Sequence, residues 1–130
     1  MTQKKRKSII SIVAVIVLGL TALVFLNLPK PVTASDASFD LAQIADGTYS
    51  GSCDNGLVKV RVEVLVKNHA IVEVRLLEHD NGLGSTAEII TDMVIQRQSV
   101  EVDAISGATI SSKTILKAVE NALSEGWKTK

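Results

Sequence analysis

A run of twenty uncharged residues near the N-terminus divides this chain into two unlike parts. The run extends from Ile9 to Leu28 and, as a helix, is long enough to cross a hydrocarbon layer of roughly 30 Å. The basic cluster Lys4–Lys7 precedes it, which predicts a cytoplasmic N-terminus and a domain on the extracytoplasmic side. The alternative is a cleaved signal peptide with Val32–Ala34 as the cleavage site, although the apolar region of a signal usually has about 7–15 residues. Both interpretations predict that the domain is exported.

The rest of the chain predicts one small domain behind a linker. We assign residues 1–28 to a cytoplasmic basic segment and transmembrane anchor, 29–44 to a polar linker, and 45–126 to the domain. Five of the fourteen basic residues lie within Lys4–Lys7 and at Lys30, which leaves nine basic against fourteen acidic side chains elsewhere. Nucleic-acid binding needs a basic surface and usually stacking aromatic residues. An acidic domain with one Trp, one Tyr and two Phe argues against that class.

Cysteine and histidine content gives little sign of catalysis or metal binding. Cys53 is the only cysteine, so an intrachain disulfide cannot form, and we expect a buried or half-buried small apolar residue there. His69 and His79 are the only histidines, and no spacing ties them to Cys53. We therefore predict no catalytic residue and no metal site in this chain.

A period-two pattern gives the clearest structural signal. Five valines, at positions 58, 60, 62, 64 and 66, alternate with Lys59, Arg61, Glu63, Leu65 and Lys67. After a turn at Asn68-His69, the residues Val72, Val74 and Leu76 alternate with Glu73, Arg75 and Leu77. Such alternation predicts an antiparallel hairpin with one face on a core and the other largely in water. An entry strand in Asp46–Gly56 is expected to precede it.

Helical spacing follows the hairpin. A loop is expected over His79–Ser85, and Ser85 with Glu88 has the spacing of a capping box that starts a helix reaching about Gln96. Its apolar stripe contains Ile89, Ile90, Met93 and Val94. The segment Ser99–Ile105 reads as another strand.

A second helix is predicted after that strand, and the elements together give the fold class. Its apolar positions are Ile115, Leu116, Val119, Ala122 and Leu123, and Gly126 is a natural stop. The fold class is therefore α+β: an N-terminal transmembrane helix, then a small domain with an antiparallel sheet and two helices.

The turn before the second helix allows two interpretations. Ser106-Gly107-Ala108-Thr109 can be a glycine turn followed by a helix whose N-cap is Ser111 or Ser112. It can also be an anion site, because the first amides of a helix lack internal partners and attract phosphate. The sequence matches neither the Walker P-loop nor the hydrolase G-x-S-x-G elbow.

The segment Val102–Leu123 resembles the flavinylation signature of the FMN-binding domain family, which includes the covalent-flavin subunits of Nqr and Rnf redox complexes. The pattern resembles D-x-x-[ST]-G-A-[ST], and its five specified positions are filled by Asp103, Ser106, Gly107, Ala108 and Thr109. The likeness extends over Asp46–Cys53, the valine hairpin and His79–Ile90, and so covers about residues 45 to 124.

The resemblance implies a covalent cofactor. In the family, a separate flavin transferase moves the FMN moiety of FAD onto the last Ser or Thr of the motif, which is Thr109 here. It also implies that Asp103 is needed for modification, by holding a metal or polarising the hydroxyl in the transferase complex. Gly107 and Ala108 would keep the acceptor accessible, and Ser111 and Ser112 would hydrogen-bond the attached phosphate.

Residues near the flavin ring are also implied by the resemblance. The loop with Asn81, Gly82 and Gly84 would approach the isoalloxazine ring, and His79 would stack on it, hydrogen-bond it or merely close the hairpin. Larger family members often carry Glu-Thr where this chain has Asp80-Asn81, so their ring contacts are not carried over.

The resulting hypothesis is a membrane-anchored electron-transfer flavoprotein. It would carry FMN esterified to Thr109 and relay electrons from a membrane donor to an extracytoplasmic acceptor. The chain has no cysteine cluster or haem motif for a second redox centre, so it would be one relay among others. The alternatives are a small extracytoplasmic flavin reductase that acts directly on a substrate, and a non-redox, membrane-tethered binding module.

Overall fold

From Ile9 to Leu26, the apolar run lies in a single long helix. The computed structural model describes residues 3–26, 39–80 and 84–128. Helix α1 spans Gln3–Leu26, and its segment Lys7–Val24 has a mean hydropathy of 2.4 with none of it buried against the rest of the chain. By length and composition this helix is a candidate membrane span, and a signal sequence would share these features.

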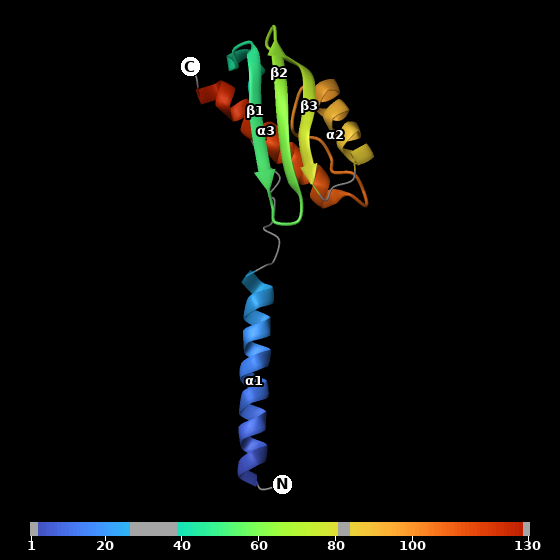
Figure 1. Cartoon of the computed structure of the whole chain (residues 1–130). Coiled ribbons are helices and arrows are strands. Elements are labelled where there is room, and N and C mark those ends of the chain that lie inside the picture. Colours follow the sequence, from blue (N-terminus) through green and yellow to red (C-terminus); the bar gives the residue numbers. More distant parts are fainter. Residues whose placement is uncertain (1–2, 27–38, 81–83, 129–130) are drawn as a thin grey trace.

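Three antiparallel strands form the sheet, in the order β1-β2-β3 (Figure 1). They are β1 (Gly47–Asp54), β2 (Lys59–Lys67) and β3 (Ala70–Asp80), and the short 3-10 helix η1 (Leu41–Gln43) precedes them. The hairpin predicted from the alternating valines is confirmed as β2–β3. Its two-residue turn has positive φ at Asn68 (53°) and His69 (59°), the geometry that matches the twist of a hairpin.

The backbone of the hairpin turn is held by Asp46. One carboxylate oxygen of Asp46 accepts a hydrogen bond from the amide of His69 at 3.2 Å. Hydrogen bonds from the amides of Asn68 and His69 lower the pKa of the Asp46 carboxyl below its ordinary value. The chain entering β1 is thereby tied to the far end of the hairpin.

The two faces of β2 differ as the alternation predicts. The five valines of the pattern are each at most 5% exposed. Strand β2 packs against helix α3 (Thr109–Lys128), whereas helix α2 (Gly84–Arg97) packs against β3 and α3. Charged side chains form ion pairs on the outer face: Lys59–Glu78 (3.4 Å), Arg61–Glu78 (2.9 Å), Arg75–Glu63 (3.2 Å) and Arg75–Glu73 (3.1 Å). Both helices lie on one face of the sheet (Figure 1), which confirms the α+β class.

Strand β3 does not keep the simple alternation expected of it. Its pairing with β2 shifts twice, so that Val72 and Leu77 are extra residues without a partner in the register. Such bulges reset which side chains face inward. Ile71 and Val74 are buried, whereas Val72 is 46% exposed, so the prediction that Val72 shares the core face with Val74 is wrong.

Two element boundaries also differ from expectation. Strand β3 continues through Asp80, so His79 lies in the sheet and not in a loop. Helix α2 begins at Gly84, which places Ser85 inside its first turn and not at the flanking cap position. The predicted capping box at Ser85 is therefore wrong, because a capping side chain must precede the first helical residue.

The strand predicted over Ser99–Ile105 is absent from the described residues, and a side chain explains why. The Gln98 amide occupies the edge of β3: its oxygen accepts from the Ile71 amide and its nitrogen donates to the Ile71 carbonyl, both at 2.8 Å. The Ser99 amide donates back to the Val94 carbonyl at 3.4 Å. The segment therefore has hydrogen-bond partners other than a strand, although Val100 is buried as a strand residue would be.

Helix α3 packs closely on β1 because a glycine faces it. A Cβ atom at Gly51 would collide with backbone atoms of Ala118 and Ala122. The predicted apolar face of this helix is confirmed, with Ile115, Val119, Ala122 and Leu123 all at most 1% exposed. Gly126 does not end the helix, which continues to Lys128; instead a Cβ there would press on Ile44 and Tyr49.

The packing at Gly51 makes a direct stability prediction. Gly51→Ala should lower the free energy of unfolding by about 1–3 kcal/mol, because the added methyl group must push α3 away from β1. Urea unfolding followed by circular dichroism measures this.

Gly47→Ala in the same strand is the matched control. Its Cβ would meet only the Tyr49 side chain, with the hydroxyl oxygen at 3.5 Å, so stability should stay within about 1 kcal/mol of wild type. Equal stabilities for the two variants would contradict the close approach of β1 and α3.

Candidate functional site

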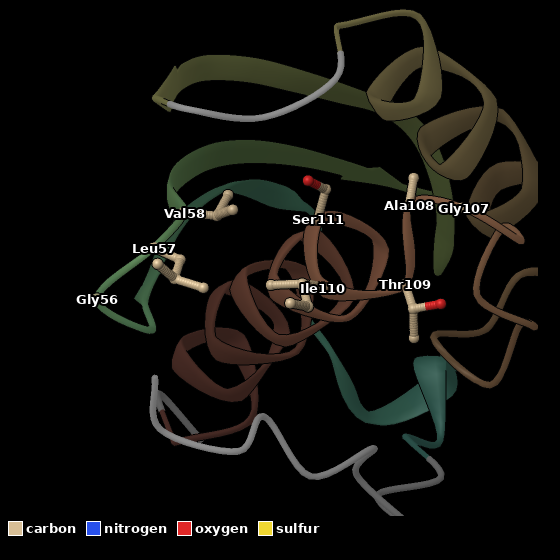
Figure 2. A pocket seen from close by; sticks show the side chains of 8 residues that line it. All are labelled: Gly56, Leu57, Val58, Gly107, Ala108, Thr109, Ile110 and Ser111. Atoms are coloured by element: carbon tan, nitrogen blue, oxygen red, sulfur yellow. The ribbon is translucent and has the colours of Figure 1, made fainter. Parts of the chain in front are cut away.

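A cleft of about 720 Å³ opens between the β1–β2 turn and the start of α3 (Figure 2). This volume falls within the roughly 300–1,000 Å³ typical of small-molecule sites. Its lining residues come from these two turns: Gly56, Leu57, Val58, Gly107, Ala108, Thr109, Ile110 and Ser111. The cleft thus contains three motif residues, together with a turn far away in the sequence.

The wall formed by the β1–β2 turn is shaped by Asn55. Its side-chain oxygen accepts hydrogen bonds from the backbone amides of Leu57 (3.0 Å) and Val58 (2.7 Å). The backbone amide of Asn55 donates to the Val58 carbonyl (3.2 Å). The Asp54 carboxylate accepts from the Gly56 amide at 2.8 Å. These bonds fix a tight turn beyond the last pair of the β1–β2 ladder, Asp54 with Lys59.

The two walls are joined by one buried hydrogen bond. The side-chain nitrogen of Asn55 donates to the hydroxyl of Thr114 at 3.1 Å, across 59 residues of sequence. The Thr114 hydroxyl in turn donates to the Ile110 carbonyl at 2.7 Å. Asn55 is 3% exposed and Thr114 is 0% exposed, so water does not compete for this bond.

The second wall is the turn that leads into α3. Gly107 has φ of 83°, in the left-handed region that favours glycine, and the Ala108 amide donates to the Ile105 carbonyl at 3.0 Å. Thr109 is the first residue of α3 and is exposed, as are Ser106 and Gly107, whereas Ala108 is buried. The motif therefore presents its last hydroxyl residue at the rim of the cleft.

Neither serine expected at the N-cap occupies that position. Helix α3 starts at Thr109, so Ser111 and Ser112 both lie inside its first turn. Ser112 is fully buried, and its hydroxyl donates to the Ala108 carbonyl (2.8 Å) and accepts from the Ile105 amide (3.1 Å). Ser112 therefore stabilises the turn, whereas Ser111 lines the cleft.

The remaining predicted site residues differ in exposure and in the element to which they belong. Asp103 is exposed in the segment before the turn. His79 pairs with Val60 of β2, and Val58 in the cleft wall lies two residues before Val60. The Nε2 of His79 is buried with no hydrogen-bond partner in the described part of the chain. Gly84 is the first residue of α2, and Asn81 and Gly82 lie outside the described residues.

Other reactive side chains do not gather at this site. Cys53 is half-buried, and burial raises the pKa of its thiol, which makes the thiolate scarce at neutral pH. No group of three or more His, Cys, Asp or Glu side chains suited to a metal ion occurs within residues 3–26, 39–80 and 84–128.

Asn55 and Thr114 were missed by sequence reasoning. Asn55 reads as an ordinary turn residue in Asp54-Asn55-Gly56, and Thr114 as a polar residue on a helix. The available signal was weak: Thr114 comes directly before Ile115, the first residue of the apolar stripe, where a buried hydroxyl would need a partner.

Comparison with known proteins connects this cleft to a family. The family model described as "FMN-binding domain" matches residues 55–124, from the Asn55 turn almost to the end of α3. The crystal structure of a Clostridium perfringens protein is similar with a TM-score of 0.50 and 23% identity, covering 67% of this chain and 92% of that protein. That likeness supports the fold alone.

Two curated proteins are similar in sequence. Urocanate reductase of Eggerthella lenta is 28% identical over 129 residues, which is 95% of this chain and 21% of the reductase. An uncharacterized protein of Treponema pallidum is 31% identical over 87 residues, which is 65% of this chain and 24% of that protein. This chain thus spans about a fifth to a quarter of the length of these relatives.

The turn geometry predicts that Gly107 is needed for stability. A Cβ at Gly107 would meet no atom within 4 Å, so the cost of Gly107→Ala is that of a left-handed backbone alone, about 1–2 kcal/mol. Thermal and urea unfolding measure it. Ser106→Ala, at the exposed neighbouring position, is the control and should change stability by less than about 0.5 kcal/mol. A Gly107→Ala protein as stable as this control would contradict the turn.

Proposed function

This chain belongs to the FMN-binding domain family, and from that premise we propose that it is a membrane-anchored electron-transfer flavoprotein with FMN esterified to Thr109. The resemblance seen in the sequence motif is thereby confirmed, and FMN is the cofactor that the family supports. The observation that carries the proposal is the position of Thr109: exposed, first in α3, and on the rim of a ligand-sized cleft.

The start of α3 suits a phosphoester. The first intrahelical hydrogen bond runs from the Ser112 amide to the Ala108 carbonyl (2.9 Å), so the amides of residues 109–111 precede it. Such amides and the helix dipole favour a phosphate group. Ser111 lines the same cleft, so its hydroxyl would contact the phosphate, while the buried Ser112 would support the site through its bond to the Ala108 carbonyl.

The cleft also offers an apolar surface to an aromatic ring. Leu57 and Ile110 line it from opposite walls, and each is 48% exposed. The flavin supplies the redox chemistry when bound, while the protein orients it and tunes its potential. Among the described residues, the buried Nε2 of His79 has no hydrogen-bond partner, so it would bind a polar ring atom, and the loop with Asn81, Gly82 and Gly84 would border the ring.

Attachment requires a transferase acting on FAD. In the proposed step, Thr109 Oγ1 forms a new bond to the phosphorus of the FMN half, and the pyrophosphate bond of FAD breaks. AMP leaves with the bridging oxygen, and the threonine proton passes to a base in the transferase complex. Asp103, exposed and six residues before the first residue of the helix, would take part from this chain, and the small residues Gly107 and Ala108 would leave room for the approach.

Helix α1 would place this flavin outside the cytoplasm. The cluster Lys4–Lys7 favours a cytoplasmic N-terminus, so the domain would receive electrons from a membrane donor and pass them to an extracytoplasmic acceptor. A covalent tether suits that location, since a lost cofactor is not easily replaced there.

A second candidate is direct reduction of a substrate. The observation that favours it is the similarity to urocanate reductase across 95% of this chain. Because this chain spans only 21% of that protein, we prefer the relay function.

Thr109→Val tests the attachment. Co-expressed with a flavin transferase, wild-type protein should be yellow after denaturation and heavier by one FMN less one water in intact-mass spectrometry. Thr109→Val keeps the shape of the side chain but removes the hydroxyl, so both signals should vanish. Thr109→Ser, which retains the hydroxyl, should keep them. A colourless wild type, or a modified Thr109→Val, would overturn the proposal.

The anchor is tested by fractionation. Full-length protein expressed in a bacterial host should stay in alkali-washed membranes, because an uncleaved apolar helix of this length binds lipid irreversibly. Protease added to spheroplasts should digest the domain. Recovery of the domain in the soluble fraction, or its protection from protease, would contradict the proposed topology.

A further inference from the structure

We propose that Asn55 and Thr114 are positioning residues for the flavin: their hydrogen bond sets the width of the cleft and holds the ring between Leu57 and Ile110. The inference rests on the proposed function, because it takes FMN to be attached at Thr109. It assigns a role to two buried residues outside the modification motif.

Besides the burial of Val58 in the core, the Asn55–Thr114 hydrogen bond holds the β1–β2 turn against α3. Strand pairing ends at Asp54 and Lys59, so the residues between them lie beyond the ladder. The bonds that Asn55 Oδ1 accepts close the turn internally, and only its Nδ2 reaches across to Thr114 on α3. A second side chain of α3, that of Asn121, donates to the Ser52 carbonyl of β1 at 2.8 Å. That hydrogen bond is exposed and lies outside the turn.

The Asn55–Thr114 bond is connected by further hydrogen bonds to both apolar walls of the cleft. A path of hydrogen bonds runs from the Leu57 amide to Asn55, on to Thr114, and from there to the Ile110 carbonyl. Figure 2 shows the side chains of Leu57 and Ile110 pointing toward one another across the cleft. Their separation is therefore controlled by groups that are almost fully buried and little affected by solvent.

A planar aromatic ring, which offers two broad faces to apolar side chains, is the kind of ligand that such a gap fits. Half-exposed Leu57 and Ile110 gain by burying their outer surfaces against it, and contacts on both faces restrict its rotation. A phosphoester at Thr109 alone would leave several rotatable bonds between helix and ring. The Asn55–Thr114 bond would thus convert a flexible tether into a fixed orientation, as electron transfer to a partner requires.

Time-resolved fluorescence anisotropy of the attached flavin tests this proposal in full-length flavinylated protein. In wild type, the flavin emission should depolarise only as the domain tumbles. Thr114→Val removes the hydroxyl that Asn55 needs, so a fast component from local ring motion should appear, with the FMN mass increment retained. Thr114→Ser restores the hydroxyl and should restore the slow decay.

Gln98→Met is the matched control. Gln98 makes three side-chain hydrogen bonds, to Ile71 and Ile95, near the hairpin turn at the opposite end of the sheet from Leu57. Loss of these hydrogen bonds should lower the free energy of unfolding, while the fluorescence anisotropy of the flavin should still decay slowly. A fast component in both Gln98→Met and Thr114→Val would show general loosening and overturn the positioning role.

Leu57→Ala keeps the test decisive if Thr114→Val does not fold. Leu57 is half-exposed, so the variant should fold normally and yet give the fast component. A slow decay in Leu57→Ala, or in a folded Thr114→Val, would overturn the inference while leaving FMN attachment intact. Absence of the mass increment from wild type would instead overturn the proposed function, and this inference with it.

Discussion

The hydrogen bond from Asn55 to Thr114 is the interaction on which the cleft depends. It joins a turn that the sheet does not hold to a helix that begins 54 residues later, and both groups are withdrawn from water. Removing one partner would leave a buried amide unsatisfied, which costs about 1–3 kcal/mol. A polar contact of this kind adds specificity to an otherwise apolar core, because only one register of α3 against β1 allows it.

Close packing makes that register possible. Gly51 lets the α3 backbone approach β1, and Gly126 lets the C-terminal part of the helix pack closely against Ile44 and Tyr49. With its buried face packed against β1 and β2, the helix presents its first residue, Thr109, to solvent. The hydroxyl that the motif marks is thus exposed as a consequence of how the rest of the helix is buried, and the acceptor role proposed for it follows from that exposure.

Regular patterns in the sequence predicted the fold, and side-chain hydrogen bonds decided where those predictions failed. The valines of β2 and the apolar stripe of α3 were predictable because burial of one face imposes a period. The prediction of a strand at Ser99–Ile105 is wrong because the side-chain amide of Gln98 forms hydrogen bonds with the edge of β3. The spacing of apolar residues gives no sign that a side chain will replace a strand there. The bulge at Val72 likewise escapes a period-two pattern. Of the candidate site, the motif and its hydroxyl were predictable, but the opposite wall was not, because Asn55 and Thr114 are 59 residues apart.

The central claim is that FMN is held on Thr109 in the cleft between the two turns. A crystal structure of the flavinylated protein tests it most directly. We expect continuous density from Thr109 Oγ1 into a phosphate at the start of α3, with the ring between Leu57 and Ile110 and the Asn55–Thr114 bond intact. Density for the flavin on another hydroxyl, or a ring lying outside the cleft, would contradict it.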